Sequence, residues 1–251
     1  MENKNDDYAD LVNHMRNGNL TVLGLLTYME GHHEKLMQMP DSVFIKYKKY
    51  YEQIQSDQLY FEKNKKHKLS DQERGKLFEQ LVGCLFFSEN KFFNKAVNCR
   101  TSTNEIDLLI DWTDIAIKER IDLIYSFMGR SFLCECKNYE NGVNVTYVGK
   151  FISLLRVNES KFGIIFTTSR IKGKGKWDSA RGLIKKVALK EDVYIVDITW
   201  SDLTKIYNNE ADIMSIIRDK YNALKNDIEY ETYIKKHDLE DKFILAAKEK
   251  E

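Results

Sequence analysis

The chain has 251 residues, of which 43% are hydrophobic, 31% charged and 12% aromatic, so it can bury one full core and is not largely disordered. Its formal net charge is zero, which by itself gives no reason to expect a polyanionic partner. No apolar run approaches the roughly 20 residues that span a bilayer, and the acidic, polar first residues do not resemble a signal peptide. We therefore expect a cytoplasmic protein with no membrane partner.

The charges are unevenly distributed along the chain. Residues 130–190 contain 13 basic and 4 acidic side chains, whereas residues 191–251 contain 9 basic and 15 acidic ones. A local basic patch matters more to a polyanion than the total charge does. The distribution therefore favours a nucleic-acid partner, with a coincidental solvated face as the alternative.

Both ends of the sequence are predicted to be helical. Glycine is absent from residues 32–74 and from residues 183–251, and Pro40 is the only proline. We expect one or two short helices over 7–30 and a long amphipathic helix over 41–66. Apolar and aromatic side chains recur along this long helix at intervals near 3.6: Phe44, Tyr47, Tyr51, Ile54 and Leu59. Such a stripe is more typical of a core-facing surface than of a base-stacking surface.

An alternating pattern of helices and strands begins at Ser70. Ser70 and Glu73 have the spacing of a capping box, which predicts a helix over 71–88. The elements predicted after it are strand 92–100, strand 105–112, strand 130–136, helix 146–158, strand 162–168, helix 178–189 and strand 193–198. Residues 113–129 are expected to form a helical insertion. Strands joined through helices imply a sheet with parallel pairs and helices on both faces.

These elements predict an α/β protein in three parts. We expect a helical N-terminal extension over 1–70, a core over 71–200 with a central mixed sheet flanked by helices, and a helical C-terminal extension over 201–251. The chain has no Gly-x-x-x-x-Gly-Lys-Ser/Thr motif, so no nucleotide cofactor is expected. Without a secretory signal its cysteines are predicted to be reduced thiols, and Cys134 and Cys136 lack a second pair at zinc-site spacing.

Acidic residues stand in or at the ends of the predicted strands. Asp107 interrupts an apolar strand, while Glu135 and Lys137, two residues apart in an extended segment, project from one face. Two converging carboxylates form the oxygen-rich site that Mg²⁺ prefers, and buried carboxylates are costly without such a partner. A neighbouring lysine can orient or deprotonate a water for attack on phosphorus. The alternative is an ion pair of Glu135 with Lys137 at the exposed end of an edge strand, with Asp107 bonded to a turn.

Four segments carry a combined pattern. They are Gly75-Lys76-Leu77-Phe78-Glu79, Ile106-Asp107-Leu108-Leu109, Glu135-Cys136-Lys137-Asn138-Tyr139 and Gly163-Ile164-Ile165-Phe166-Thr167-Thr168-Ser169. In order and spacing they resemble the Mrr-like restriction endonucleases of the PD-(D/E)xK nuclease superfamily. The resemblance runs from about residue 74 to residue 200 and implies that the core over 71–200 is a restriction-endonuclease-like catalytic core.

The resemblance implies a role for each of five residues. Asp107 and Glu135 would bind the metal directly, with the main-chain carbonyl of Cys136 as a further ligand. Glu79 would reach the metal directly or through water, and Lys137 would activate the attacking water. The implied cofactor is Mg²⁺, with Mn²⁺ able to substitute. The sequence departs from many relatives in having Glu135 where they have Gln, and in the length of the segment between Asp107 and Glu135.

A basic loop with spaced glycines is predicted between the strand at 162–168 and the following helix. Its basic residues, with one from that helix, are Arg170, Lys172, Lys174, Lys176 and Arg181. Lysines and main-chain amides in such a loop are suited to contact with phosphates, and a merely solvated loop is the alternative.

The resemblance implies a metal-dependent endonuclease that hydrolyses DNA phosphodiester bonds in restriction or phage defence. Two alternatives stay open at this point: a structure-selective repair nuclease such as a Holliday-junction resolvase, and a catalytically idle nuclease fold that binds nucleic acid. The repair nuclease would have the same site residues. The intact set Glu79, Asp107, Glu135 and Lys137 argues against the idle fold. Cutting both strands usually needs two active sites, which favours a homodimer.

Overall fold

A computed structural model describes residues 38–86, 92–100, 105–118, 121–138, 142–169, 171–172 and 179–226, apart from the side chains of 98–100 and 105. The elements below all belong to one compact unit, Met39–Glu251. The short helices predicted over 7–30 lie outside the described residues. None of the helices that are described is both long and apolar enough to cross a membrane.

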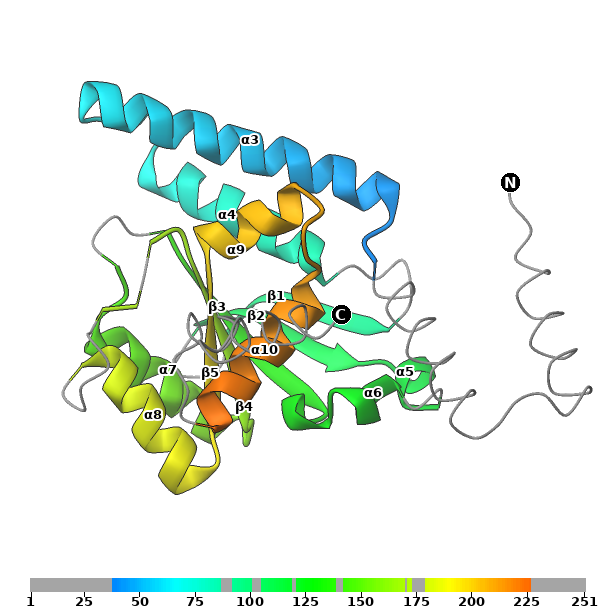
Figure 1. Cartoon of the computed structure of the whole chain (residues 1–251). Helices are drawn as coiled ribbons and strands as arrows, with labels where there is room; N and C mark the ends of the chain where they lie inside the picture. Colours follow the sequence, from blue (N-terminus) through cyan, green and yellow to red (C-terminus); the bar gives the residue numbers. More distant parts are fainter. Residues whose placement is uncertain are drawn as a thin grey trace, which may run out of the picture. The chain divides into compact units, whose positions relative to one another are not determined.

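The centre of the fold is a five-stranded mixed sheet in the order β1-β2-β3-β4-β5 (Figure 1). Its strands are β1 (Phe93–Arg100), β2 (Glu105–Trp112), β3 (Ser131–Lys137), β4 (Phe162–Thr167) and β5 (Tyr194–Thr199). Strands β1, β2 and β3 pair antiparallel, whereas β3, β4 and β5 pair in parallel. The predicted mixed sheet is therefore confirmed, and β3 is its central strand.

Helices surround this sheet, as the sequence predicted (Figure 1). The longer ones are α3 (Asp41–Asn64), α4 (Asp71–Leu85), α7 (Val145–Val157), α8 (Ala180–Glu191), α9 (Trp200–Tyr207) and α10 (Ile213–Lys225). The predicted capping box at Ser70 is present at the start of α4. The region 113–129 contains α5 (Asp114–Lys118), α6 (Ile121–Ile124) and a 3-10 helix (Ser126–Met128), which agrees with the expected helical insertion.

The two faces of the sheet are covered by different helices. Phe86, at the end of α4, meets Phe132 of β3 and Phe166 of β4 edge to face, which places α4 on one side. Gly163 of β4 is three residues from Phe166, so its side-chain position faces the opposite side of the sheet, because side chains alternate along a strand. A Cβ atom on Gly163 would lie only 2.7 Å from the Phe151 ring of α7. The missing side chain therefore lets α7 pack closely against this second face.

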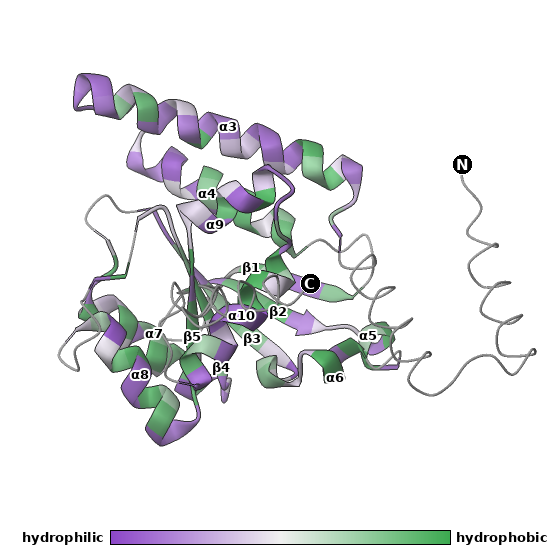
Figure 2. Cartoon of the chain, viewed as in Figure 1, coloured by the Kyte–Doolittle hydropathy of each residue, from purple (hydrophilic) through white to green (hydrophobic). Residues whose placement is uncertain are grey.

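The aromatic stripe of α3 is largely core, as expected. The Tyr51 ring stacks on Trp200 and Tyr207 of α9, with ring centroids 4.5 and 4.3 Å away. Leu59 does not share this burial, because 52% of it is exposed. The buried position of that helical turn is held by Asp57, and Leu59 points about 200° further round the helix. Figure 2 shows hydrophilic and hydrophobic residues alternating along α3.

Candidate active site

Glu135 and Lys137 lie on the central strand of the sheet. Their side chains form an ion pair, and only 17% of the Glu135 side chain and 16% of the Lys137 side chain are exposed. The Lys137 Nζ atom also lies 5.9 Å from the centroid of the Tyr147 ring in α7. Because β3 has a neighbouring strand on each side, the pair does not occupy the exposed end of an edge strand. This position counts against a purely structural surface ion pair.

Asp107 of β2 is held beside the same part of β3. The register pairs Leu108 with Cys134, so one further step along both strands sets Asp107 opposite Glu135. The Asp107 Oδ2 atom accepts a hydrogen bond of 2.7 Å from the main-chain N–H of Cys136. Elsewhere in the sheet a main-chain carbonyl accepts such an N–H, whereas here the Asp107 carboxylate accepts it. This hydrogen bond ties the Asp107 carboxylate to β3.

The electrostatics of Glu135 bring Glu79 into the same site. Burial raises the pKa of Glu135 above its usual value of 4.5, the negative charges of Asp107 and Glu79 raise it further, and Lys137 opposes the shift. Glu79 is a half-buried residue of α4. The structure therefore brings together Glu79, Asp107, Glu135 and Lys137, whose catalytic roles stay predictions.

The neighbouring cysteines are poor candidates for metal ligands. Burial and the charge of Asp107 raise the pKa of the Cys134 and Cys136 thiols, so both stay protonated near neutral pH. Neither is in a disulfide, in agreement with the prediction of reduced thiols. The donors that this site can offer are therefore oxygen atoms.

The oxygen donors of the site fit a hard divalent cation. The Asp107 and Glu135 carboxylates lie on adjacent strands, and the carbonyl of Cys136 follows Glu135 in β3; such oxygens are the ligands of Mg²⁺. A cation would relieve the repulsion that raises the pKa of Glu135. Within the described part of the chain, no three His, Cys, Asp or Glu side chains could hold a metal ion by themselves. The main-chain carbonyl, and Glu79 through water, would therefore have to complete the ligand set.

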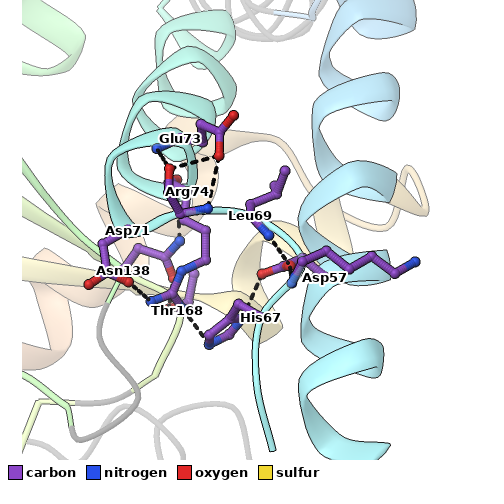
Figure 3. Close-up of polar contacts among 10 residues, drawn as sticks. Asp57, His67, Leu69, Asp71, Glu73, Arg74, Asn138 and Thr168 are labelled. Atoms are coloured by element: carbon purple, nitrogen blue, oxygen red, sulfur yellow. Dashed lines mark hydrogen bonds and ion pairs between the residues drawn. The ribbon is translucent and has the colours of Figure 1, made fainter. Parts of the chain in front are cut away.

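A polar network ties this site to its surroundings (Figure 3). Asn138 directly follows Lys137; its Nδ2 donates to the main-chain oxygen of Arg74 at 3.3 Å, and its Oδ1 accepts from Thr168 Oγ1 at 2.8 Å. Asn138 thereby joins the end of β3 to the end of β4 and to α4, which carries Glu79. The sequence patterns predicted no role for Asn138 or Thr168, although both directly follow the last residue of a strand, which was the available signal.

The network continues from Arg74 to the buried side of α3. Arg74 Nη1 donates to His67 Nε2 at 2.5 Å, which leaves the Nδ1–H of His67 to donate to Asp57 Oδ2 at 2.6 Å. Burial by itself would raise the pKa of Asp57, but the main-chain N–H groups of Leu69 and Lys68 and the His67 ring hold it below its usual value. The Asp57 carboxylate thus fixes the connection between α3 and α4, and with it the start of α4.

The predicted nucleic-acid-binding residues are described only in part. Lys172 is exposed, and its main-chain N–H donates to the carbonyl of Val143 at 2.9 Å. Arg181 is half-buried in the first turn of α8. The remaining three, Arg170, Lys174 and Lys176, lie outside the described residues.

The raised pKa of Glu135 predicts that Glu135→Gln stabilises the metal-free protein. A raised pKa means that ionisation of Glu135 lowers the free energy of unfolding. This loss of stability is absent when the pH is below the ordinary pKa of a glutamate, and it grows as the pH rises through the raised pKa. In EDTA at pH 8 we expect the variant to have a higher Tm than wild type, because the pKa of Glu135 is raised even though Lys137 opposes the shift, so that relief from burial of the charge and from the repulsion of Asp107 and Glu79 outweighs loss of the ion pair. The difference should vanish near pH 4. The control is Glu62→Gln at an exposed position of α3, and an equal or lower Tm at every pH would contradict the prediction.

Comparison with known proteins agrees with this arrangement. Residues 70–198 match the sequence model of the Mrr_cat family, which is described as a restriction endonuclease. No curated protein and no solved structure gives a significant match. The matched segment begins at the cap of α4, ends in β5, and includes Glu79, Asp107, Glu135 and Lys137. Because the match covers more than half of the chain, the protein belongs to the Mrr catalytic-domain family of restriction endonucleases and has their α/β fold.

Proposed function

We propose that this protein is a metal-dependent endonuclease that hydrolyses phosphodiester bonds in DNA. The proposal rests above all on one observation: Asp107, Glu135 and Lys137 meet on the adjacent antiparallel strands β2 and β3, where the charge of Glu79 also acts. Membership of the restriction-endonuclease family supports the reaction class and DNA as the substrate.

In this proposal each residue has a separate task. Asp107, Glu135 and the main-chain carbonyl of Cys136 would hold Mg²⁺, and Glu79 would reach it through water. When bound, Mg²⁺ neutralises charge on the phosphate oxygens and lowers the pKa of water. Lys137, paired with Glu135, donates hydrogen bonds that orient the attacking water, or it first gives its own proton to solvent and then takes one from the water. The water oxygen bonds to phosphorus while the P–O bond to the leaving strand breaks, and the leaving oxygen takes a proton from solvent. The hydrogen bond from Cys136 to Asp107 keeps β2 and β3 at the spacing that this requires.

The family also supports a biological role in restriction or phage defence. We expect duplex DNA as the substrate and Mn²⁺ as a substitute for Mg²⁺. Since cutting both strands usually needs two active sites, a homodimer is the proposed cleaving form. The division into a helical extension over 1–70, a catalytic core over 71–200 and a helical extension over 201–251 is part of the same proposal.

Metal dependence is tested by incubating the purified protein with plasmid DNA, methylated plasmid DNA and RNA. We expect plasmid cleavage with Mg²⁺ or Mn²⁺, none in EDTA, and recovery when Mg²⁺ is added in excess. A second readout does not depend on cleavage: Mg²⁺ should raise the Tm of wild type more than that of Glu135→Gln. Full cleavage in excess EDTA would exclude the metal mechanism, and cleavage of RNA alone would exclude DNA as the substrate.

A further inference from the structure

Lys137 occupies the last position of β3, where the pairing with β4 also ends. Its register partner, Thr167, is the last residue of β4. The sheet holds such a residue only on the side toward the centre of the strand, and the ends of elements open more easily than their centres. A group that must meet the reacting atoms needs a fixed main chain, because a displacement of about 1 Å can cost about 10²-fold in rate. The position of Lys137 therefore depends on what holds the next residue.

That next residue, Asn138, uses both ends of its side-chain amide (Figure 3). Its Nδ2 atom donates at 3.3 Å to the main-chain oxygen of Arg74, in the first turn of α4. Its Oδ1 atom accepts at 2.8 Å from the hydroxyl of Thr168, directly after β4. A carboxylate of the same shape could not make both bonds, because the Arg74 carbonyl requires a donor. Asn138 thus links the end of β3 to the start of α4 and to the end of β4.

The partner of Asn138 at the end of β4 is itself held in place. Thr168 lies between Thr167, which is fully buried, and Ser169. The main-chain N–H of Ser169 donates to Thr167 Oγ1 at 3.2 Å, and the two hydroxyl oxygens are 3.3 Å apart. The chain on both sides of Thr168 is therefore tied to a buried residue, and its hydroxyl reaches Asn138 from a fixed main chain.

The partner of Asn138 in α4 is held from α3. Arg74 Nη1 donates to His67 Nε2 at 2.5 Å, and His67 Nδ1 bonds to the buried carboxylate of Asp57 in α3 at 2.6 Å. Glu79 follows five residues after Arg74 in the same helix. The amide of Asn138 therefore joins the strand end that carries Lys137 to the helix that carries Glu79.

We propose that Asn138 is a positioning residue of the active site. Through Arg74 and Thr168 it fixes the end of β3. It thereby sets where Lys137 and the proposed metal ligands of β3 stand relative to Glu79. Asn138 acts through these residues and does not itself touch the metal, the water or the phosphate. The assignment rests on the proposed endonuclease function for its reaction.

The test removes one bond of Asn138 without changing Asn138 itself. Thr168→Val replaces the hydroxyl with a methyl group of nearly the same size, whereas Thr168→Ser keeps the hydroxyl. Thr204→Val is the matched control, because Thr204 of α9 is also half-buried and its hydroxyl bonds to Tyr51 Oη at 2.8 Å. Cleavage is measured in single turnover with Mg²⁺, and the affinity for a fluorescent DNA duplex is measured in EDTA.

The expected result is a loss of rate without a loss of affinity. Thr168→Val should cut about 10–100-fold more slowly than wild type, the usual effect of removing a group that orients an active-site residue. Its affinity for the duplex should be nearly that of wild type. Thr168→Ser should recover most of the rate, and the control should cut like wild type. A Thr168→Val variant that cuts as fast as the control overturns the proposal. One that loses affinity while the bound complex cuts at the wild-type rate also overturns it, because Thr168 is then a DNA contact.

Asn138→Ala provides a second test and covers the case in which Thr168→Val does not fold. It removes both bonds at a half-buried position and should cut at least as slowly as Thr168→Val. The double variant should be no slower than Asn138→Ala alone, because the Thr168 hydroxyl has already lost its acceptor. If the two losses of rate multiply, the residues act separately and the proposal is wrong.

The affinity for Mg²⁺ is a readout that does not need cleavage. It is taken from the rise in Tm during a Mg²⁺ titration, and Thr168→Val should need about 10-fold more Mg²⁺ than wild type for the same rise. If wild type cuts DNA and Thr168→Val matches it in rate and in Mg²⁺ affinity, Asn138 has no positioning role and the endonuclease stands. If wild type binds Mg²⁺ and cuts no DNA, while Thr168→Val binds Mg²⁺ more weakly, the endonuclease is wrong and Asn138 still positions a metal site. Wild type that neither binds Mg²⁺ nor cuts DNA overturns both proposals.

Discussion

Asp107→Asn is expected to abolish DNA cleavage while the protein stays folded. The asparagine side-chain oxygen can still accept the N–H of Cys136, but the negative charge that would bind the metal is lost. The loss in single-turnover rate should exceed the roughly 10–100-fold that follows when a residue that merely orients a metal ligand is removed. Asp111→Asn is the matched control, because Asp111 lies in the same strand and pairs with Ser131 at its other end. Wild-type cleavage by Asp107→Asn would remove this residue from the site.

Asp107→Ala separates the two roles of this carboxylate. Charge repulsion alone predicts that removing an acidic residue from this cluster stabilises the metal-free protein. Alanine, however, also leaves the main-chain N–H of Cys136 without its acceptor, which costs about 1–3 kcal/mol for a buried group. We therefore expect a lower Tm for Asp107→Ala than for Asp107→Asn, with both variants inactive.

Lys137→Ala should lower single-turnover cleavage by about 10²–10⁴-fold, the usual contribution of a positioned proton-transfer group. DNA binding should be nearly unchanged, because the role proposed for Lys137 is in the chemistry. Lys150→Ala is the matched control: its Nζ atom is also 5.9 Å from the Tyr147 ring, but it lies on the exposed surface of α7. If Lys137→Ala weakens binding while the bound complex still cuts at the wild-type rate, Lys137 is a phosphate contact and not a catalytic residue.

Local patterns were sufficient to predict most of the elements and part of the site. The capping box at Ser70 consists of contacts within four residues, so its spacing alone predicts the start of α4. The two-residue period of a strand places Glu135 and Lys137 on one face. Leu59 shows the limit of such patterns, because approximate spacing did not separate the buried face of α3 from its neighbour.

Contacts between distant segments could not be predicted in the same way. The hydrogen bond from Cys136 to Asp107 joins residues 29 apart, and it depends on the register of β2 and β3 and on the insertion between them. The contact of Asn138 with Arg74 spans 64 residues. The pocket lined by Ile184, Lys205 and Leu224 needs α8, α9 and α10 to pack around the end of β5. Such arrangements arise from the packing of the whole unit, whereas sequence periodicity reports only on the local element.

The buried pair of Lys220 and Asp202 has a consequence for how the protein is made. Asp202 is buried in α9, directly after β5, and its cationic partner follows 18 residues later in α10. Before α10 emerges from the ribosome, the main-chain N–H and the hydroxyl of Thr199 can donate hydrogen bonds to the Asp202 carboxylate, but they cannot balance its negative charge. Removing one partner of a buried ion pair typically costs about 3–5 kcal/mol. A nascent chain that ends before residue 220 should therefore hold β5 poorly, so the fold around the active site is expected to be complete only after α10 has been synthesised.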